Sequence, residues 1–272
     1  MVATQMPTTR VIPTGSITPD VLRSEWIKLR TVRSTAWTLF AAAVAMIGLS
    51  AIVCAVYVAQ YDTISAKDRL TFSAASFSLT GGFLAQLAIA VLGVLVITNE
   101  YGSGMIRATF AAVPQRLTVL AAKAIVFAGV TLVVTTTASF IAFFLGQSIL
   151  SAKGIGVGIG SHDALRVVIG TGLYLAVLGL LALALGTIIR KTAGAIALVF
   201  GLIFVLPAIV SLLPSSMSSI QKFLPSNAGQ ALVDGTRRGT AALSPWVGFG
   251  VFCAYAAFAL VVAGALLVRR DA

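Results

Sequence analysis

The chain has 272 residues, of which 58% are hydrophobic and only 10% are charged, and its mean hydropathy is +1.02. A soluble domain carries about a quarter of charged residues, so this composition excludes an ordinary water-soluble protein. The net charge of +11 would suggest a nucleic-acid partner in a soluble protein. In this chain, cations that flank membrane helices explain the charge, and no nucleic-acid partner is expected.

Six stretches without a charged residue predict six transmembrane helices. Each stretch is roughly 23 to 30 residues long, and a helix needs about 20 apolar residues to cross the bilayer core. The predicted fold class is therefore an all-α, polytopic membrane protein. The six stretches cover residues 34–61, 70–99, 124–152, 167–189, 192–221 and 239–268.

The predicted organisation is a disordered tail over residues 1–17, an amphipathic interfacial helix over 18–35 and a six-helix transmembrane domain over 36–272. If the N-terminus lies inside, the inner segments hold twelve Lys and Arg residues and the outer segments hold seven. This bias obeys the positive-inside rule. We therefore expect both termini in the cytoplasm and the protein in the plasma membrane.

The stretch "LRSEWIKLRTVRST" concentrates charge just before the first apolar run. On a helix, Trp26 and Leu29 share an apolar face that can lie at the headgroup boundary, while Lys28 projects from a flank toward anionic lipid. Glu25 falls inside the apolar arc, where a carboxylate facing lipid would be costly. We expect Glu25 to meet a cation or backbone donors on another element or another subunit. A simple interfacial anchor is the alternative interpretation.

The second inner segment, "NEYGSGMIRATFAAVPQRLTVLAAK", predicts a short helix between two breakers. Gly104 precedes it and Pro114 stops it. The spacing of its apolar residues predicts an exposed apolar face that, with Arg107, suits insertion into a groove on another protein. A packed interfacial turn is the alternative. The apolar residues are Ile106, Phe110 and Val113.

The chain offers little for catalysis or ion coupling. It has no Walker A sequence, and its single histidine, His162, falls in a predicted outer loop. No charged residue falls in the middle of a predicted span, which argues against a secondary carrier. We expect no enzymatic activity, metal or cofactor site on this chain. Polar residues inside the spans are candidates for a translocation path, although they can equally bond their own backbone; these are Gln86, Thr131, Thr135 and Ser139.

Three segments resemble the permease subunits of ABC-2 type transporters, especially the six-helix permeases common in high-GC Gram-positive bacteria. They are the "SEWIKLRTVRST" start, the second inner segment and "FLPSNAGQAL" in the last predicted outer loop. The resemblance implies a partner ATP-binding subunit that carries ATP and Mg²⁺, and a second permease copy in a homodimer or heterodimer. A non-transporting membrane module, such as an assembly or immunity partner, is the alternative.

The resemblance also assigns roles to particular residues. It implies that Glu25 and Trp26 lie on an interfacial connecting helix, and that the second inner segment is a coupling helix that docks on the ATPase. Export of a substrate would then be driven by ATP hydrolysis on the partner. The residues that match the coupling pattern are Glu100, Gly104, Arg107, Pro114, Arg116 and Lys123.

Overall fold

A computed structural model describes residues 19–65, 69, 72–161, 163–212, 218–234 and 243–269. The predicted tail over residues 1–17 and the predicted loop position of His162 lie outside these residues. No strand occurs among the described residues, and the predicted all-α class is confirmed.

In the described part of the chain, six helices are long and apolar enough to cross a membrane, as predicted. The first and fourth begin and end within a few residues of the predicted spans. The second and sixth begin later than predicted, the third begins earlier, and the fifth ends earlier. Five are single helices and the fifth in order is a composite. They are α2 (Arg33–Gln60), α5 (Gly82–Gly102), α7 (Arg116–Leu150), α8 (Ala164–Ile189), α9 (Thr192–Phe200) continued by α10 (Leu206–Ser211), and α13 (Pro245–Arg269).

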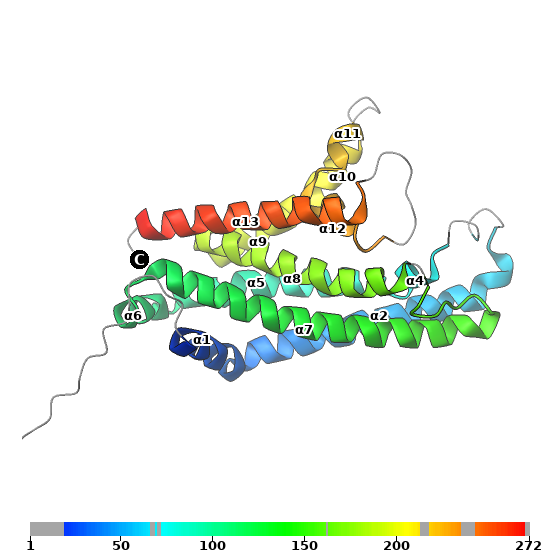
Figure 1. The fold of residues 1–272 in the computed structure, drawn as a ribbon, viewed down its shortest axis with the longest axis horizontal. Coiled ribbons are helices and arrows are strands. Elements are labelled where there is room, and N and C mark those ends of the chain that lie inside the picture. Colours follow the sequence, from blue (N-terminus) through cyan, green and yellow to red (C-terminus); the bar gives the residue numbers. More distant parts are fainter. Residues whose placement is uncertain are drawn as a thin grey trace, which may run out of the picture.

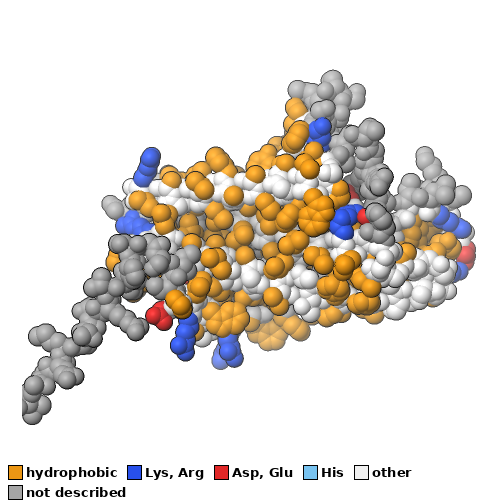
Figure 2. Space-filling model, viewed as in Figure 1, with side chains coloured by type: hydrophobic (Ala, Val, Ile, Leu, Met, Phe, Trp, Pro, Cys, Tyr) orange, Lys and Arg blue, Asp and Glu red, His pale blue; other side chains and the backbone are white. Residues whose placement is uncertain are grey.

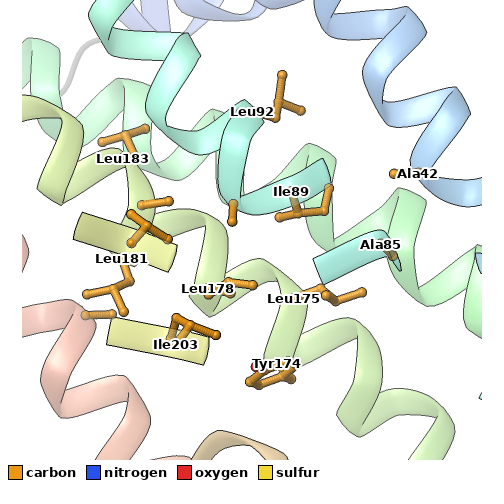
Figure 3. Close-up of a cluster of buried hydrophobic side chains, with 14 of the residues drawn as sticks. Ala42, Ala85, Ile89, Leu92, Tyr174, Leu175, Leu178, Leu181, Leu183 and Ile203 are labelled. Carbon is orange, nitrogen blue, oxygen red and sulfur yellow. The ribbon is translucent and has the colours of Figure 1, made fainter. Parts of the chain in front are cut away.

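Helix α8 forms the centre of the bundle. Its most apolar window is 78% buried, whereas the corresponding windows of the other spans are between 22% and 50% buried. Figure 1 shows α8 between α7 and α13, and it also packs against α5 and α9. The side chains of Leu175, Leu178 and Leu181 carry the core along α8 (Figure 3).

The outer helices present apolar side chains on the surface of the bundle. Trp37 is 68% exposed and Phe258 and Val261 are each 70% exposed. Figure 2 shows hydrophobic side chains over the middle of the bundle, with Lys and Arg toward its two ends. An apolar belt bounded by cations is the surface that a bilayer covers, so the chain is a multi-pass membrane protein.

Short helices gather at the two ends of the bundle (Figure 1). Helix α1 (Pro19–Thr31), helix α6 (Met105–Ala112) and the end of α13 lie at one end, which we call the α1 end. The opposite end carries α4 (Ala74–Phe77), α12 (Pro225–Gln230) and the turn after α7. The remaining short elements are η1 (Tyr61–Thr63), η2 (Ser151–Lys153) and α11 (Ser218–Gln221).

The second span starts later than predicted, because the chain turns between α4 and α5. The Ser50 hydroxyl accepts a hydrogen bond from the Gly81 backbone N–H at 3.0 Å. A Cβ on Gly81 would lie 1.9 Å from the Met46 carbonyl oxygen, so only glycine permits this approach to α2. Residues 70–81 were predicted as part of the span because they carry no charge. A contact with α2, rather than local hydropathy, sets the start of α5.

The fifth span contains a π-helical segment, η3 (Gly201–Val205), between α9 and α10. Pro207 follows it at the start of α10. A proline ring clashes with the carbonyl four residues earlier in a regular α-helix, and a wider turn relieves that clash. The proline therefore accounts for the irregularity in the fifth span.

Helices α5 and α8 approach closely at Gly93. A Cβ at this position would lie 2.5 Å from the Gly179 carbonyl oxygen and 2.8 Å from the Ala182 Cβ. Small residues at such crossings let two membrane helices bring their backbones together. The contact between α5 and the central helix therefore depends on Gly93.

We predict that Gly93→Ala destabilises the bundle by about 1–3 kcal/mol, because the added methyl group must separate two packed backbones. Thermal unfolding of the purified chain in detergent measures the effect. Gly129→Ala is the matched control, since a Cβ at Gly129 meets nothing within 4 Å. An unfolding temperature for Gly93→Ala equal to that of Gly129→Ala would contradict the close approach.

Candidate functional site

Four charged side chains meet at the α1 end of the bundle. Glu25 and Lys28 come from α1, Glu100 comes from the last turns of α5, and Lys123 comes from the second turn of α7. We call these four residues the charge cluster. Three of them are almost completely buried: Glu25 and Lys123 are each 2% exposed and Glu100 is 4% exposed.

The charge cluster is a chain of short ion pairs. Lys123 Nζ lies 2.5 Å from Glu25 Oε2 and 2.7 Å from Glu100 Oε1, so one ammonium joins α1 and α5 to α7. Lys28 Nζ lies 2.7 Å from Glu25 Oε1 and 3.5 Å from Glu100 Oε1. Two carboxylates and two ammonium groups give the cluster no net charge, which is the arrangement that buried charges require.

The charge cluster contains the partner that was expected for Glu25. The sequence predicts a cation on another element, and the structure confirms this with Lys123 of α7. Lys123 itself was counted among the cations of the inner loops, but it is a buried residue of the helix. The family resemblance singles out Lys123 but not its pairing with Glu25, because a lysine two turns inside an apolar helix usually extends its side chain back to the interface.

The face of α1 that packs on the bundle differs from the predicted one. Val21 and Glu25 are buried and Leu29 packs against the core, while Trp26 is 48% exposed. The predicted arc placed Trp26 and Leu29 together on the lipid side. Helix α1 instead packs with Glu25 against α7, because Glu25 forms an ion pair with Lys123. Trp26 and Ile27 therefore lie at the surface.

Helix α6 is bounded by the predicted breakers. Gly104 precedes it with φ +72°, a left-handed conformation that favours glycine, and Val113 follows with an extended backbone before Pro114. The predicted exposed apolar face is wrong, however. Ile106 is only 3% exposed, and Phe110 packs against the core with its ring 5.5 Å from the Arg116 guanidinium. The apolar side of α6 therefore packs against the bundle and is not exposed for a partner protein.

The outward side of α6 carries small residues and one cation. Arg107, Ala108, Ala111 and Ala112 are all exposed. Met105, at the start of the helix, is 42% exposed. We call this side the α6 outer face. Arg107 and Met105 are its only long side chains.

One further contact ties α6 to the bundle and another ties α7 to α13, and neither partner was predicted. Lys28 Nζ donates to Thr109 Oγ1 at 3.3 Å, which joins the charge cluster to α6. Arg116 Nη1 donates to the Leu267 carbonyl oxygen at 2.9 Å, which joins the start of α7 to the last turn of α13. A backbone carbonyl carries no sequence signal, and Thr109 is one of many threonines, so sequence alone could not single them out.

The four candidate path residues are buried inside the bundle. Thr135 Oγ1 donates to the Thr131 carbonyl at 2.7 Å and Ser139 Oγ donates to the Thr135 carbonyl at 2.8 Å. These bonds favour the alternative interpretation, in which the hydroxyls bond their own helix. Gln86 Nε2 and Thr131 Oγ1 have no hydrogen-bond partner within the described part of the chain.

The fold and the cluster together define a class of protein: a multi-pass helical membrane protein with a charge-linked assembly of helices at one end. Residues 21–216 match the family described as "ABC-2 family transporter protein". The matched residues make up well over half of the chain and extend from α1 to just past α10. The chain therefore belongs to this transporter family, and it is a transport permease. No curated protein matches the chain significantly.

We predict that Lys123→Met destabilises the protein by about 3–5 kcal/mol, because two buried carboxylates lose their shared cation. The double variant Lys123→Met with Glu25→Gln should be more stable than Lys123→Met alone, since it removes one of the stranded charges. Unfolding in detergent measures both.

Lys153→Met is the matched control, because the Lys153–Asp62 pair lies at the surface with side chains 35% and 78% exposed. It should leave the unfolding temperature unchanged. If Lys123→Met behaves like Lys153→Met, the charge cluster does not hold the helices together.

Proposed function

We propose that this permease works in an ATP-driven exporter, in which a separate ATPase subunit docks on α6 and supplies the energy. The observation that carries the proposal is the position of α6: its outer face lies on the surface of this chain, while its other side contacts α1, α5 and α7. A partner docked on the outer face can displace a short helix in this position. The contacts on its other side then transmit the displacement to the bundle.

The contacts of α6 give the proposed route of transmission. Thr109 leads through Lys28 to Glu25 on α1 and to Glu100 on α5. Phe110 leads to Arg116 at the start of α7, and Arg116 continues to α13. Because ion pairs and packed side chains are stiff, a displacement of α6 moves these helix ends together.

ATP then acts by shifting a population. The ATPase binds ATP better when its two copies are closed, and closure favours whichever permease state brings the two α6 helices to matching positions. Two permease copies are needed for this, as homodimer or heterodimer. The hydrolysis itself belongs to the partner, with its ATP and Mg²⁺, and this chain contributes no catalytic residue.

The proposed orientation follows from the same assignment. An ATPase works in the cytoplasm, so the α1 end faces the cytoplasm and both termini lie there, in agreement with the excess of cations in the inner segments. The membrane is then the plasma membrane. Two buried polar atoms inside the spans, Gln86 Nε2 and Thr131 Oγ1, are the candidates for groups that the outward-facing state uncovers.

Arg107→Glu should weaken co-purification of the chain with an ATPase encoded by the adjacent gene, because it reverses the one charge of the α6 outer face. Arg23→Glu is the matched control, since Arg23 is an exposed cation of α1. We expect Arg107→Glu to lower the recovered ATPase about tenfold or more, as for loss of an interfacial charge contact, and Arg23→Glu to leave it unchanged.

A stable complex that tolerates both substitutions equally would remove α6 as the docking element. Failure to bind any ATPase would contradict the proposed ATP-driven coupling. The permease variants are first checked for an unchanged unfolding temperature, so that misfolding is not read as lost docking.

Glu25→Gln should separate docking from transmission, because Glu25 lies inside the bundle and cannot touch a partner. In lipid nanodiscs the ATPase should still assemble with Glu25→Gln, but transport-coupled ATP hydrolysis should fall. Wild-type hydrolysis in an assembled Glu25→Gln complex would contradict the proposed route through the charge cluster.

A further inference from the structure

A cavity of about 220 Å³ opens beside the charge cluster, between α1, the first turns of α2 and the last turns of α5. We call it the α1–α5 cavity. Its rim includes the exposed residues Val32, Ser103 and Met105, and its floor includes the buried residues Glu25 and Glu100. Ser34, Thr35 and Thr38 line the α2 side.

Glu100 lines this cavity and has one carboxylate oxygen without a hydrogen-bond partner. Its Oε1 accepts a hydrogen bond from Lys123 at 2.7 Å, whereas its Oε2 is buried and has no partner within the described residues. A buried carboxylate oxygen without a donor is costly, and nearly all such groups in proteins are satisfied. The cavity beside Glu100 therefore suits a group that donates hydrogen bonds and carries positive charge.

The charge balance of the cluster further limits the class of ligand that the cavity can bind. The cluster is neutral, so a simple cation would leave one uncompensated charge in a largely buried site. A zwitterion keeps the balance. Its ammonium would pair with the Glu100 carboxylate, and its phosphate with Lys28, whose side chain is 27% exposed and lines the same cavity. The ammonium must carry N–H groups, because a quaternary ammonium cannot donate a hydrogen bond to the carboxylate.

The walls of the cavity indicate where this ligand comes from. Leu92, Leu95 and Val96 of α5 line its deeper side. Leu92 lies eight residues before Glu100 on the same helix, which places it about 12 Å further into the membrane. A polar end at the level of a helix terminus and an apolar wall toward the bilayer core match a headgroup with its attached chain. We propose that the α1–α5 cavity binds the ethanolamine headgroup of a membrane phospholipid.

This site would hold α1 to α2 and α5 from the lipid side, next to the ion pairs that hold it from the protein side. The lipid would be a bound component of the permease and not its cargo. The inference does not rest on the ATPase partner, because it concerns only contacts within this chain. Binding can be measured on the permease alone.

The test is native mass spectrometry of the full chain, delipidated in detergent and titrated with phosphatidylethanolamine or with phosphatidylcholine of identical chains. The wild type should retain phosphatidylethanolamine with about tenfold preference, the value of one charge-assisted hydrogen bond. Equal retention of the two lipids would overturn the proposal, since a hydrated cavity without a specific donor site does not distinguish them.

Two variants test the location of the site. Glu100→Gln should abolish the preference, whereas Asp20→Asn, the same change at an exposed acid of α1, should keep it. Thr38→Leu fills the cavity without touching the charge cluster and should also abolish it. Its control is Thr31→Leu, because Thr31 is an exposed residue whose hydroxyl makes the same kind of backbone bond as that of Thr38. Preference retained in folded Thr38→Leu would overturn the site even if Glu100→Gln fails to fold.

Free phosphoethanolamine distinguishes a lipid from a soluble amine. It should displace the bound lipid only weakly, because it has no chain to cover Leu92, Leu95 and Val96. Displacement as effective as that by an ethanolamine lysophospholipid would contradict the membrane source and assign the cavity to a soluble zwitterion.

Discussion

The cost of burying charge is the constraint on which the α1 end of this permease depends. Glu25, Glu100 and Lys123 are out of water, and each is tolerable only while its partners stay within ion-pair distance. Helices α1, α5 and α7 therefore cannot separate one at a time without stranding a charge. Through Lys28 and Thr109 the same constraint extends to α6.

The rest of the bundle complements this rigid end. Central helix α8 is buried among its neighbours, and close contacts such as the one at Gly93 fix α5 against it. The fifth span is different: it is the least buried of the six and carries a π-helical turn before Pro207. Stiff, charge-linked helices at the α1 end and a weakly packed, interrupted helix beside them give the permease parts that can move relative to one another.

The spans were predictable because a bilayer imposes a length and a polarity that hydropathy alone reveals. The start of α5 was not, because it is set by the contact of Gly81 with Met46 and Ser50 on α2. In the site, the anomaly of Glu25 predicted a cation elsewhere, but only the fold identifies Lys123. The orientation of α6 was predicted wrongly. The spacing of Ile106 and Phe110 shows that they share a face, but it does not show whether the chain's own bundle or a partner protein covers that face.

The proposed coupling requires that α6 and α1 move as one unit when ATP binds to the partner. Spin labels at exposed positions outside the α6 outer face test this in the assembled complex, with the two copies labelled at Ser103, just before α6, or at Arg30 of α1. Distances between copies are measured by pulsed electron paramagnetic resonance without ATP and with ATP trapped. We expect both distances to change together and in the same direction. A change between the Ser103 labels with no change between the Arg30 labels would show that α6 moves without α1.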